Sequence, residues 1–215
     1  MIEINNILEQ YITNNSEKED EVLADLYRQT YLKIYHPRMI SGHIQGKLLE
    51  MLSRMISPEK ILEIGTYTGY SAICLAKGLK SSGKLITIEK NDEIRDFALS
   101  YFKKAGLYNK IIVKTGDAIN IITKLDGPFD LVFIDGEKTE YSEYFDLVID
   151  KVKTGGYIIA DNILWSGKVI DLDKSKNDPA TKGIIKFNKK ITEDHRVDNV
   201  ILTIRDGLML IRVKN

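Results

Sequence analysis

Beyond Pro58 the chain alternates between short apolar runs and segments in which apolar residues recur every three or four positions. Short apolar runs predict buried strands, and the longer period predicts amphipathic helices. Their alternation is typical of βαβ units, which build a mostly parallel sheet with helices on its faces. The predicted strands are residues 60–64, 84–89, 110–114, 129–134, 155–160, 198–204 and 208–213. The predicted helices between them are residues 70–79, 92–105, 117–124, 140–151 and 179–192.

The last two predicted strands lie too close in sequence for a helical crossover. Only Arg205, Asp206 and Gly207 separate them, and Asp-Gly between apolar runs is a strong signal of a β-hairpin. The fold class that follows is α/β. We expect a doubly wound, seven-stranded sheet that is mostly parallel and ends in an antiparallel C-terminal hairpin.

The first 57 residues show the helical period, with a polar break at residues 13–16. Ser16 and Glu19 have the spacing of a capping box at the start of a second helix, and Pro37 is expected to end that helix. A third helix is predicted over residues 42–55. Its inward-facing residues are expected to be Leu48, Leu49, Leu52 and Met55.

Length and composition set the expected organisation. The chain has 215 residues, of which 43% are hydrophobic and 29% charged. These values predict one globular domain over residues 1–215, with N-terminal helices in 1–57 and the α/β core in 58–215.

Charge and cysteine content bound the partners and the compartment. Lys and Arg total 31, as do Asp and Glu, so the formal net charge is zero. This argues against a long nucleic acid held by a basic surface, although a short target stays open. The lone Cys74 lies in an apolar predicted helix, so we expect a buried, reduced thiol. No stretch reaches the ~20 apolar residues of a membrane span, and residues 1–5 do not resemble a secretion signal. We therefore expect a cytoplasmic protein without a membrane partner.

A turn with two glycines follows the first predicted strand. Glu63, Gly65 and Gly69 form the pattern Glu-x-Gly-x-x-x-Gly, which lacks the second glycine of the dinucleotide fingerprint. Gly65 would let the backbone turn sharply and let a ligand approach closely. The pattern suits a ligand with cationic groups and a ribose, such as S-adenosylmethionine, better than a pyrophosphate.

Glu89 ends the second predicted strand, 24 residues after Gly65. In doubly wound folds an acid about 20 residues beyond the glycine turn accepts hydrogen bonds from a ribose. Together, the turn and Glu89 favour a nucleoside ligand over an ordinary βα connection.

Oxygen-bearing side chains also follow the fourth and fifth predicted strands. Asp135 comes directly after residues 129–134, and Asp161 and Asn162 follow residues 155–160. Neighbouring parallel strands end at the same edge of a sheet, so these three side chains should meet. Such a set suits Mg²⁺, Mn²⁺ or Ca²⁺, whereas zinc is disfavoured because no Cys or His lies in these segments. Asp135 and Asp161 could instead be helix caps.

Lys138 lies three residues after Asp135 and just before a predicted helix. Most lysines are solvated surface charges. A divalent cation beside this one would favour its neutral form, which can act as a general base. Lys138 is therefore the candidate catalytic residue.

In these residues the chain resembles the cation-dependent O-methyltransferases, the group that contains the catechol and caffeoyl-CoA O-methyltransferases. The resemblance extends from about residue 35 to the C-terminus, and the motifs occur in the family's order. They are residues 35–42, 63–71, 88–89, 115–118, 134–138 and 160–162.

The resemblance implies a Rossmann-like sheet, S-adenosylmethionine as methyl donor, a vicinal dihydroxy aromatic as acceptor, and a homodimer. It assigns the metal to Asp135, Asp161 and Asn162, and the base to Lys138. The residues expected to hold the donor are Ser41, Glu63, Gly65, Thr66, Tyr67, Gly69, Ser71, Glu89, Asp117, Ala118 and Asp135.

The chain departs from the family in the acceptor region. Gly136 and Glu137 stand where the animal catechol enzymes have a His-Trp pair, so the acceptor wall is built differently. Trp165 is either an aromatic wall over the acceptor or part of a surface loop. The three histidines show no partner pattern and are expected to be structural, and residues 171–178 are expected to form a mobile loop beside the site.

Three alternatives to a catechol-type enzyme stay open. The acceptor could be a hydroxylated uridine in transfer RNA, against which the neutral charge counts modestly. An NAD-linked oxidoreductase is disfavoured by the broken glycine fingerprint. A binding protein without turnover is disfavoured because Lys138 and all three metal ligands are present.

Overall fold

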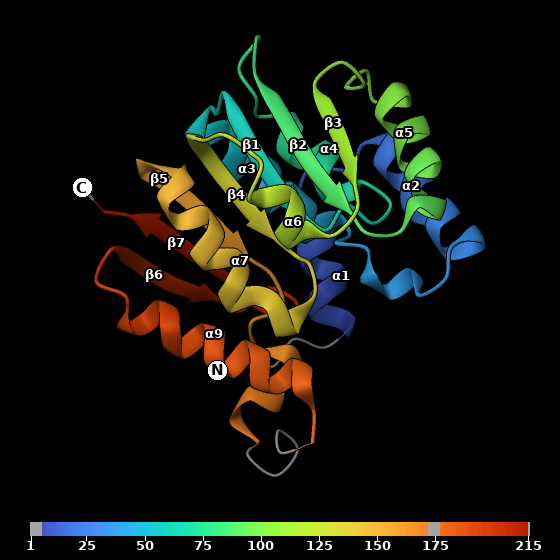
Figure 1. Cartoon of the computed structure of the whole chain (residues 1–215). Coiled ribbons are helices and arrows are strands. Elements are labelled where there is room, and N and C mark those ends of the chain that lie inside the picture. Colours follow the sequence, from blue (N-terminus) through green and yellow to red (C-terminus); the bar gives the residue numbers. More distant parts are fainter. Residues whose placement is uncertain (1–5, 172–176, 215) are drawn as a thin grey trace.

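The computed structural model describes residues 6–171 and 177–214, and within them seven strands form one sheet. The strand order is β3-β2-β1-β4-β5-β7-β6 (Figure 1). The strands are β1 (Lys60–Ile64), β2 (Lys84–Glu89), β3 (Ile111–Thr115), β4 (Phe129–Ile134), β5 (Val152–Ala160), β6 (Val197–Leu202) and β7 (Leu208–Val213). The first five run parallel, and β7 pairs antiparallel with both β5 and β6. The predicted fold class, including the hairpin, is confirmed.

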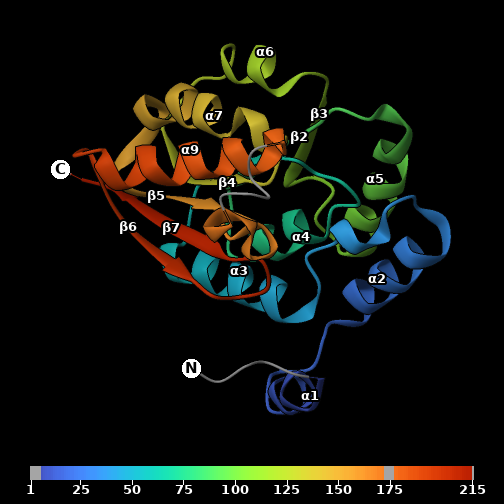
Figure 2. The ribbon, with the colours of Figure 1, turned by 90° about the horizontal axis from the view of Figure 1, so that it is seen from below.

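Helices cover both faces of the sheet. Figure 2 shows α6, α7 and α9 on one face and α3, α4 and α5 on the other. Each face has its own buried apolar cluster, with Phe145 and Phe187 in the first and Leu49 and Phe102 in the second. The helices are α1 (Asn6–Asn14), α2 (Glu21–Lys33), α3 (His43–Ile56), α4 (Tyr70–Ala76), α5 (Arg95–Lys104), α6 (Ala118–Ile122), α7 (Tyr141–Val148) and α9 (Pro179–Glu193).

Short 3₁₀ turns complete the described elements. They are η1 (Pro37–Met39), η2 (Asp92–Ile94), η3 (Lys138–Glu140), η4 (Ile149–Lys151) and η5 (Trp165–Ile170). Two of them, η2 and η4, occupy the ends of predicted helices, so α5 and α7 are shorter than their apolar period suggested. No described helix combines the length and the apolar character that a membrane crossing needs.

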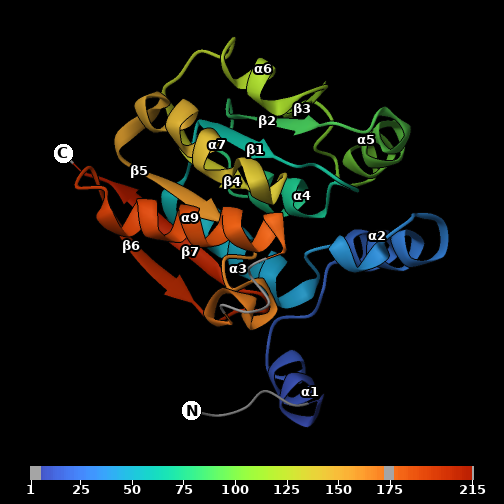
Figure 3. The same cartoon turned by 60° about the horizontal axis from the view of Figure 1, so that its bottom comes forward.

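The N-terminal helices differ in how they join the body. Figures 2 and 3 both show α1 standing away from the sheet, whereas α2 and α3 lie against the α4 side. In α3 the buried residues are Gln45, Gly46, Leu49, Glu50 and Ser53. Met55 is 80% exposed, so its predicted inward position is wrong. The buried face of α3 consists mainly of polar and small residues, which a prediction from hydropathy does not place in the core.

The predicted helix boundaries near α2 also need correction. Asp20, and not Ser16, caps this helix, because its carboxylate accepts hydrogen bonds from the main-chain N–H groups of Val22 and Leu23. Ser16 instead donates to the main-chain oxygen of Ile12. The helix ends at Lys33, before Pro37, which begins η1.

Two further predictions concern Cys74 and the segment after Asp171. Cys74 is fully buried and free, as expected, and burial raises the pKa of its thiol. The loop predicted at residues 171–178 lies largely outside the described residues, which exclude 172–176.

Candidate functional site

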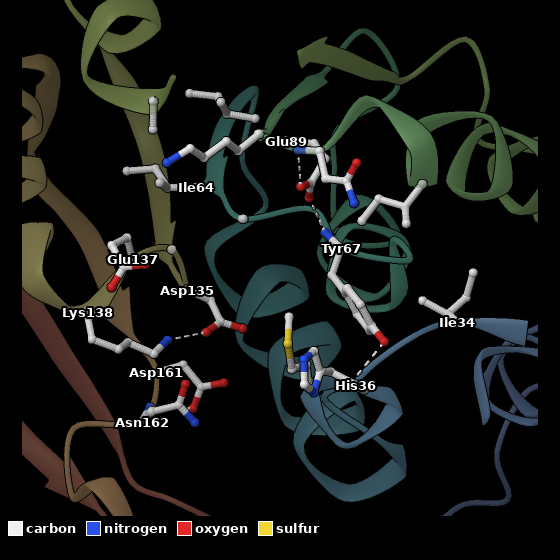
Figure 4. A pocket seen from close by; sticks show the side chains of 18 of the residues that line it. Ile34, His36, Ile64, Tyr67, Glu89, Asp135, Glu137, Lys138, Asp161 and Asn162 are labelled. Carbon is white, nitrogen blue, oxygen red and sulfur yellow. Dashed lines mark hydrogen bonds and ion pairs between the residues drawn. The ribbon is translucent and has the colours of Figure 1, made fainter. Parts of the chain in front are cut away.

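The carboxyl ends of β1, β2, β4 and β5 surround an open cavity of about 1380 Å³. Figure 4 shows Lys138, Asp135, Asp161 and Asn162 together on one side of this cavity, with Tyr67 and Glu89 across from them. Open α/β sheets bind ligands at this edge, where the order of the strands reverses. Here the reversal lies between β1 and β4. From β1 the sheet extends through β2 and β3 on one side, and through β4 and β5 on the other.

Gly65 brings the ends of β1 and β4 into contact. Its φ is +102°, and its N–H donates to the main-chain oxygen of Ile88 at 3.0 Å. A Cβ at this position would collide with the main-chain oxygen of Asp135. Glycine is therefore required both for the turn and for this close approach.

Glu89 is held at the cavity wall by the backbone. The main-chain N–H of Tyr67 donates to its Oε2 at 2.7 Å, and that of Asn91 donates to its Oε1 at 2.8 Å. Burial raises the pKa of Glu89, and these N–H groups oppose the shift. Each carboxylate oxygen still has a second lone pair, with which it can accept a ligand hydroxyl.

Glu63 lies behind the cavity wall and is fully buried. The hydroxyl of Ser71 donates to Oε1 at 2.6 Å, and that of Thr87 donates to Oε2 at 2.5 Å. Burial raises the pKa of Glu63 to about 8, and the nearby charges of Asp135 and Glu89 add to the shift. Glu63 thus connects β1, β2 and α4 beneath the glycine turn.

Replacing Glu63 with glutamine is expected to reduce the pH dependence of stability. The raised pKa means that the folded protein keeps a proton, between about pH 4.5 and pH 8, that the unfolded chain releases. The free energy of unfolding of the wild type therefore falls across this window, by at most roughly 1.4 kcal/mol per pH unit from this group. Denaturant unfolding at pH 5 and pH 8 measures the difference.

The glutamine can keep the buried hydrogen bonds. Its oxygen can accept from Ser71, and its amino group can donate to Thr87, whose hydroxyl lies 2.5 Å from that of Thr66. Glu9→Gln, on the exposed surface of α1, is the control. Identical pH slopes for the wild type and Glu63→Gln would show that Glu63 is not the group responsible.

The strand register places Asp135 and Asp161 side by side. Ile134 of β4 pairs with Ala160 of β5, so the residues that follow them emerge as neighbours. The N–H of Asp161 donates to the main-chain oxygen of Ile134 at 3.0 Å. Asn162 comes next with a φ of +55°, which turns its side chain toward the same region, as Figure 4 shows.

Asp161 is nearly fully buried, with 4% of its surface exposed. Burial raises its pKa to about 7, and the charge of Asp135 contributes to the shift. The side-chain amide of Gln45 donates to Oδ2 at 2.5 Å, and the N–H of Asn162 donates to Oδ1 at 2.7 Å. Two carboxylates thus repel each other in a poorly solvated place.

Lys138 lies directly beside this pair. Its Nζ donates to Asp135 Oδ1 and to the hydroxyl oxygen of Tyr141, both at 2.7 Å. The Tyr141 hydroxyl faces the main-chain oxygens of Ile134 and Asp161 at 3.3 and 3.2 Å. Burial raises the pKa of Tyr141 well above 10, so this hydroxyl keeps its proton. Tyr141 therefore accepts the hydrogen bond from Lys138 as a neutral hydroxyl.

The structure divides the predicted site residues into two sets. Those on the cavity wall are Gly65, Tyr67, Glu89, Asp117, Ala118, Asp135, Lys138, Asp161 and Asn162. Those buried behind the wall are Ser41, Glu63, Thr66, Gly69 and Ser71. The second set can support the first, because Glu63 and Ser71 bond to each other beneath the turn.

Sequence reasoning missed several residues at the site. His36, expected to be structural, lines the cavity in a left-handed conformation. Arg205 also lines it and donates to the main-chain oxygens of Ile40, at 2.8 Å, and Ser41. Asn91 and Gln45 hold the two buried carboxylates, Glu89 and Asp161. Two of these four had a sequence signal, since Arg205 begins the Arg-Asp-Gly turn and His36 lies within residues 35–42, which resemble a family motif.

Trp165 lines the cavity and is half-buried. Its indole N–H points to Asp178 Oδ2 at 3.5 Å, and the ammonium group of Lys168 lies 5.8 Å from the ring centre. Trp165 therefore lies at the cavity wall, and its role over the acceptor stays a prediction.

The oxygen atoms of the three predicted metal ligands fit a hard divalent cation. Asp135, Asp161 and Asn162 offer carboxylate and amide oxygens, which Mg²⁺ and Ca²⁺ prefer. A cation here would also relieve the repulsion that raises the pKa of Asp161. Over residues 6–171 and 177–214, no group of three or more His, Cys, Asp or Glu side chains is arranged to hold a metal. The predicted set differs from such a group, because its third member is an amide.

Comparisons with known proteins agree on one family. A model described as O-methyltransferase matches residues 13–214. The catechol O-methyltransferase of Niastella koreensis is 37% identical over 179 residues, which cover 79% of this chain and 80% of that protein. The caffeoyl-CoA O-methyltransferase of Petroselinum crispum is 33% identical over 220 residues, which cover 95% and 90%. The structure of the O-methyltransferase TomG from Streptomyces achromogenes, in complex with S-adenosylmethionine, matches with a TM-score of 0.90 at 31% identity, covering 98% and 97%.

Proposed function

Since the chain belongs to the O-methyltransferase family and is an S-adenosylmethionine-dependent O-methyltransferase, we propose that it methylates a hydroxyl of a catechol-like small molecule with the help of a divalent cation. The observation that carries the proposal is the convergence of Asp135 and Asp161 on one sheet edge, with Lys138 Nζ 2.7 Å from Asp135. The family assignment sets aside the NAD-linked alternative.

The proposed donor site lies on the β1–β2 side of the cavity. Glu89 would accept hydrogen bonds from the ribose hydroxyls, since its carboxylate is fixed by the N–H groups of Tyr67 and Asn91. Ala118 and Asp117 line the cavity beyond it and would border the adenine. Gly65 lines the cavity and would lie beside the methionine part of the donor.

The proposed metal ligands are Asp135, Asp161 and Asn162. When bound, Mg²⁺, or Mn²⁺ or Ca²⁺ in its place, supplies positive charge that makes an acceptor hydroxyl more acidic. Lys138 occupies only Oδ1 of Asp135, so Oδ2 would be the atom available to the metal. The amine of Lys138 would then lie beside the site of the acceptor.

Lys138 would then take the proton from the acceptor hydroxyl at Nζ. The acceptor oxygen would then bond to the methyl carbon of S-adenosylmethionine as the bond between that carbon and sulfur broke. The methyl ether and S-adenosylhomocysteine would be the products. Tyr141 would orient Lys138 through their 2.7 Å hydrogen bond.

The wall around Lys138 supports an aromatic acceptor. Trp165, Met39 and His36 line the cavity, and Met39 is 58% exposed. Flat apolar and aromatic side chains favour a planar ring, which stacks against them. The relatives named for catechol and caffeoyl-CoA substrates support the same class of acceptor.

Other proposed properties concern the protein as a whole. A homodimer assembled through the N-terminal helices is in keeping with α1 standing apart and with the exposure of Tyr11 and Met55. A single domain over residues 1–215 and a cytoplasmic location stay predictions of the sequence.

A labelled-methyl assay over a panel of acceptors tests the proposal. We expect transfer to a vicinal dihydroxy aromatic with Mg²⁺, loss of transfer with a chelator, and recovery when Mg²⁺ is added back. The panel includes catechols, caffeoyl esters and hydroxylated transfer RNA, with monohydroxy analogues of the catechols as controls. Transfer that a chelator leaves unchanged would contradict the metal dependence, and transfer to the RNA alone would favour the nucleic-acid acceptor.

A further inference from the structure

Gln45 is a buried amide that touches the proposed metal site from behind. It lies in the first turn of α3, is 1% exposed, and donates from Nε2 to Asp161 Oδ2 at 2.5 Å. It does not line the cavity, so it has no direct access to an acceptor or donor. The two residues are 116 positions apart in the sequence.

The other buried polar residues of α3 have partners away from the site. Ser53 donates to the main-chain oxygen of Leu75 at 2.6 Å. Glu50 pairs with Lys47, Arg54 and Lys77. These contacts join α3 to itself and to α4. Gln45 differs from them because its hydrogen bond is made to a carboxylate at the site.

The position of Gln45 is fixed by close packing of α3 on α4. A Cβ on the next residue, Gly46, would lie 2.5 Å from a ring carbon of Tyr70 and 2.9 Å from the sulfur of Cys74. Gly46 therefore lets the two helices approach closely beside Gln45. An amide carried on such a firmly seated helix can hold a carboxylate in one orientation.

We infer that Gln45 is a positioning residue, which orients the Asp161 carboxylate so that it and Asp135 can bind one divalent cation. The inference rests on the proposed metal dependence. Asp161 has two oxygens, and the bond from Gln45 to Oδ2, together with that from Asn162 N–H to Oδ1, fixes the plane of the carboxylate. Partners behind a metal ligand fix its orientation, and their loss typically costs about 10–100-fold in metal affinity.

Gln45→Met tests the inference, because methionine has a similar length and helix propensity but no N–H donor. The dissociation constant for Mn²⁺ is measured from the electron paramagnetic resonance signal of free Mn²⁺, with S-adenosylhomocysteine at saturation. We expect it to rise roughly 10–100-fold. The affinity for S-adenosylhomocysteine, measured by calorimetry, should stay within about twofold, since Gln45 does not line the cavity.

A second variant separates positioning from packing. Gln45→Asn keeps a buried amide but is one methylene shorter, so it should lose the bond to Asp161 and weaken Mn²⁺ binding as Gln45→Met does. It also serves if Gln45→Met folds poorly. At saturating Mn²⁺ the kcat of either variant should approach that of the wild type, while the Mn²⁺ concentration for half activity rises. Gln10→Met, on the exposed surface of α1, is the matched control.

The outcomes distinguish this inference from the proposed function. Wild-type Mn²⁺ affinity in both Gln45→Met and Gln45→Asn would overturn the role of Gln45 and leave the metal dependence standing. Failure of the wild type itself to bind Mn²⁺ would overturn the metal dependence, and the role of Gln45 with it. Weaker Mn²⁺ binding in both variants, with an unchanged affinity for S-adenosylhomocysteine, supports the inference.

Discussion

Replacing Lys138 with alanine is expected to lower kcat by about 10²–10⁴-fold, the usual contribution of a general base. Lys138 Nζ is the amine that lies 2.7 Å from Asp135, beside the oxygen ligands proposed to hold the metal. Its side chain is 12% exposed, so bulk water is poorly placed to take over its role. The rate of methyl transfer in a single turnover measures the effect.

Binding of S-adenosylmethionine to Lys138→Ala should stay close to that of the wild type. The proposed donor contacts lie across the cavity, at Glu89 and Tyr67, as Figure 4 shows. A loss of kcat with unchanged donor affinity would therefore place the defect in the chemical step.

Lys153→Ala is the matched control for this experiment. Lys153 pairs with Asp130 at 2.7 Å, the same distance as the Lys138–Asp135 pair, but it does not line the cavity. Its removal should leave kcat near the wild-type value. A Lys138→Ala enzyme that keeps wild-type kcat would remove Lys138 from the role of base.

The strand ends were the most predictable part of the site. Glu89, Asp135 and Asp161 each end or directly follow an apolar run, and Glu63 lies one residue before the end of β1. Parallel strands bring such positions to one edge. The pairing of Ile134 with Ala160 then makes Asp135 and Asp161 neighbours, as their positions in the sequence suggested. The local sequence pattern was enough to predict this part of the site, because the backbone determines where strands end and which ends share an edge of the sheet.

Contacts between distant elements could not be predicted in the same way. Gln45 reaches Asp161 only because Gly46 lets α3 pack closely on α4. Arg205 reaches Ile40 and Ser41 from the far hairpin, 165 and 164 positions away. Nothing in the local sequence around either residue encodes the partner, since the contact depends on how complete elements pack.

The loop expected to hold the methyl donor also contains features that the sequence could predict and features that it could not. Gly65 and Tyr67 lie on the cavity wall, whereas Glu63 and Ser71 are buried behind it. The sequence placed all four near the donor, but it could not tell which of them face the cavity. That difference depends on the turn after β1, where Gly65 and Tyr67 both have positive φ.

Replacing Asp135 with asparagine is expected to lower methyl transfer about 10³-fold, equal to about 4 kcal/mol of transition-state stabilisation. Asparagine keeps the size of the side chain and an oxygen for the bond to Lys138, but it removes a charged metal ligand. The residual activity should no longer respond to Mg²⁺ or to a chelator. Wild-type enzyme treated with a chelator should fall to about the same rate.

A stability measurement gives a second, independent readout of Asp135→Asn. The charge of Asp135 helps to raise the pKa of Asp161 from 3.8 to about 7, after burial as the larger cause. In that window the folded wild type holds a proton that the unfolded chain releases, so its free energy of unfolding falls as the pH rises. Without the Asp135 charge the pKa of Asp161 should drop, and the metal-free variant should lose less stability between pH 5 and pH 8.

Asp146→Asn is the control, because Asp146 pairs with Lys190 at 2.7 Å on the surface and lies outside the cavity wall. It should change neither the activity nor the response to a chelator. An Asp135→Asn enzyme whose activity stays high and sensitive to a chelator would exclude Asp135 as a ligand. A flatter pH dependence together with lost Mg²⁺ dependence would instead tie both effects to one pair of carboxylates, Asp135 and Asp161.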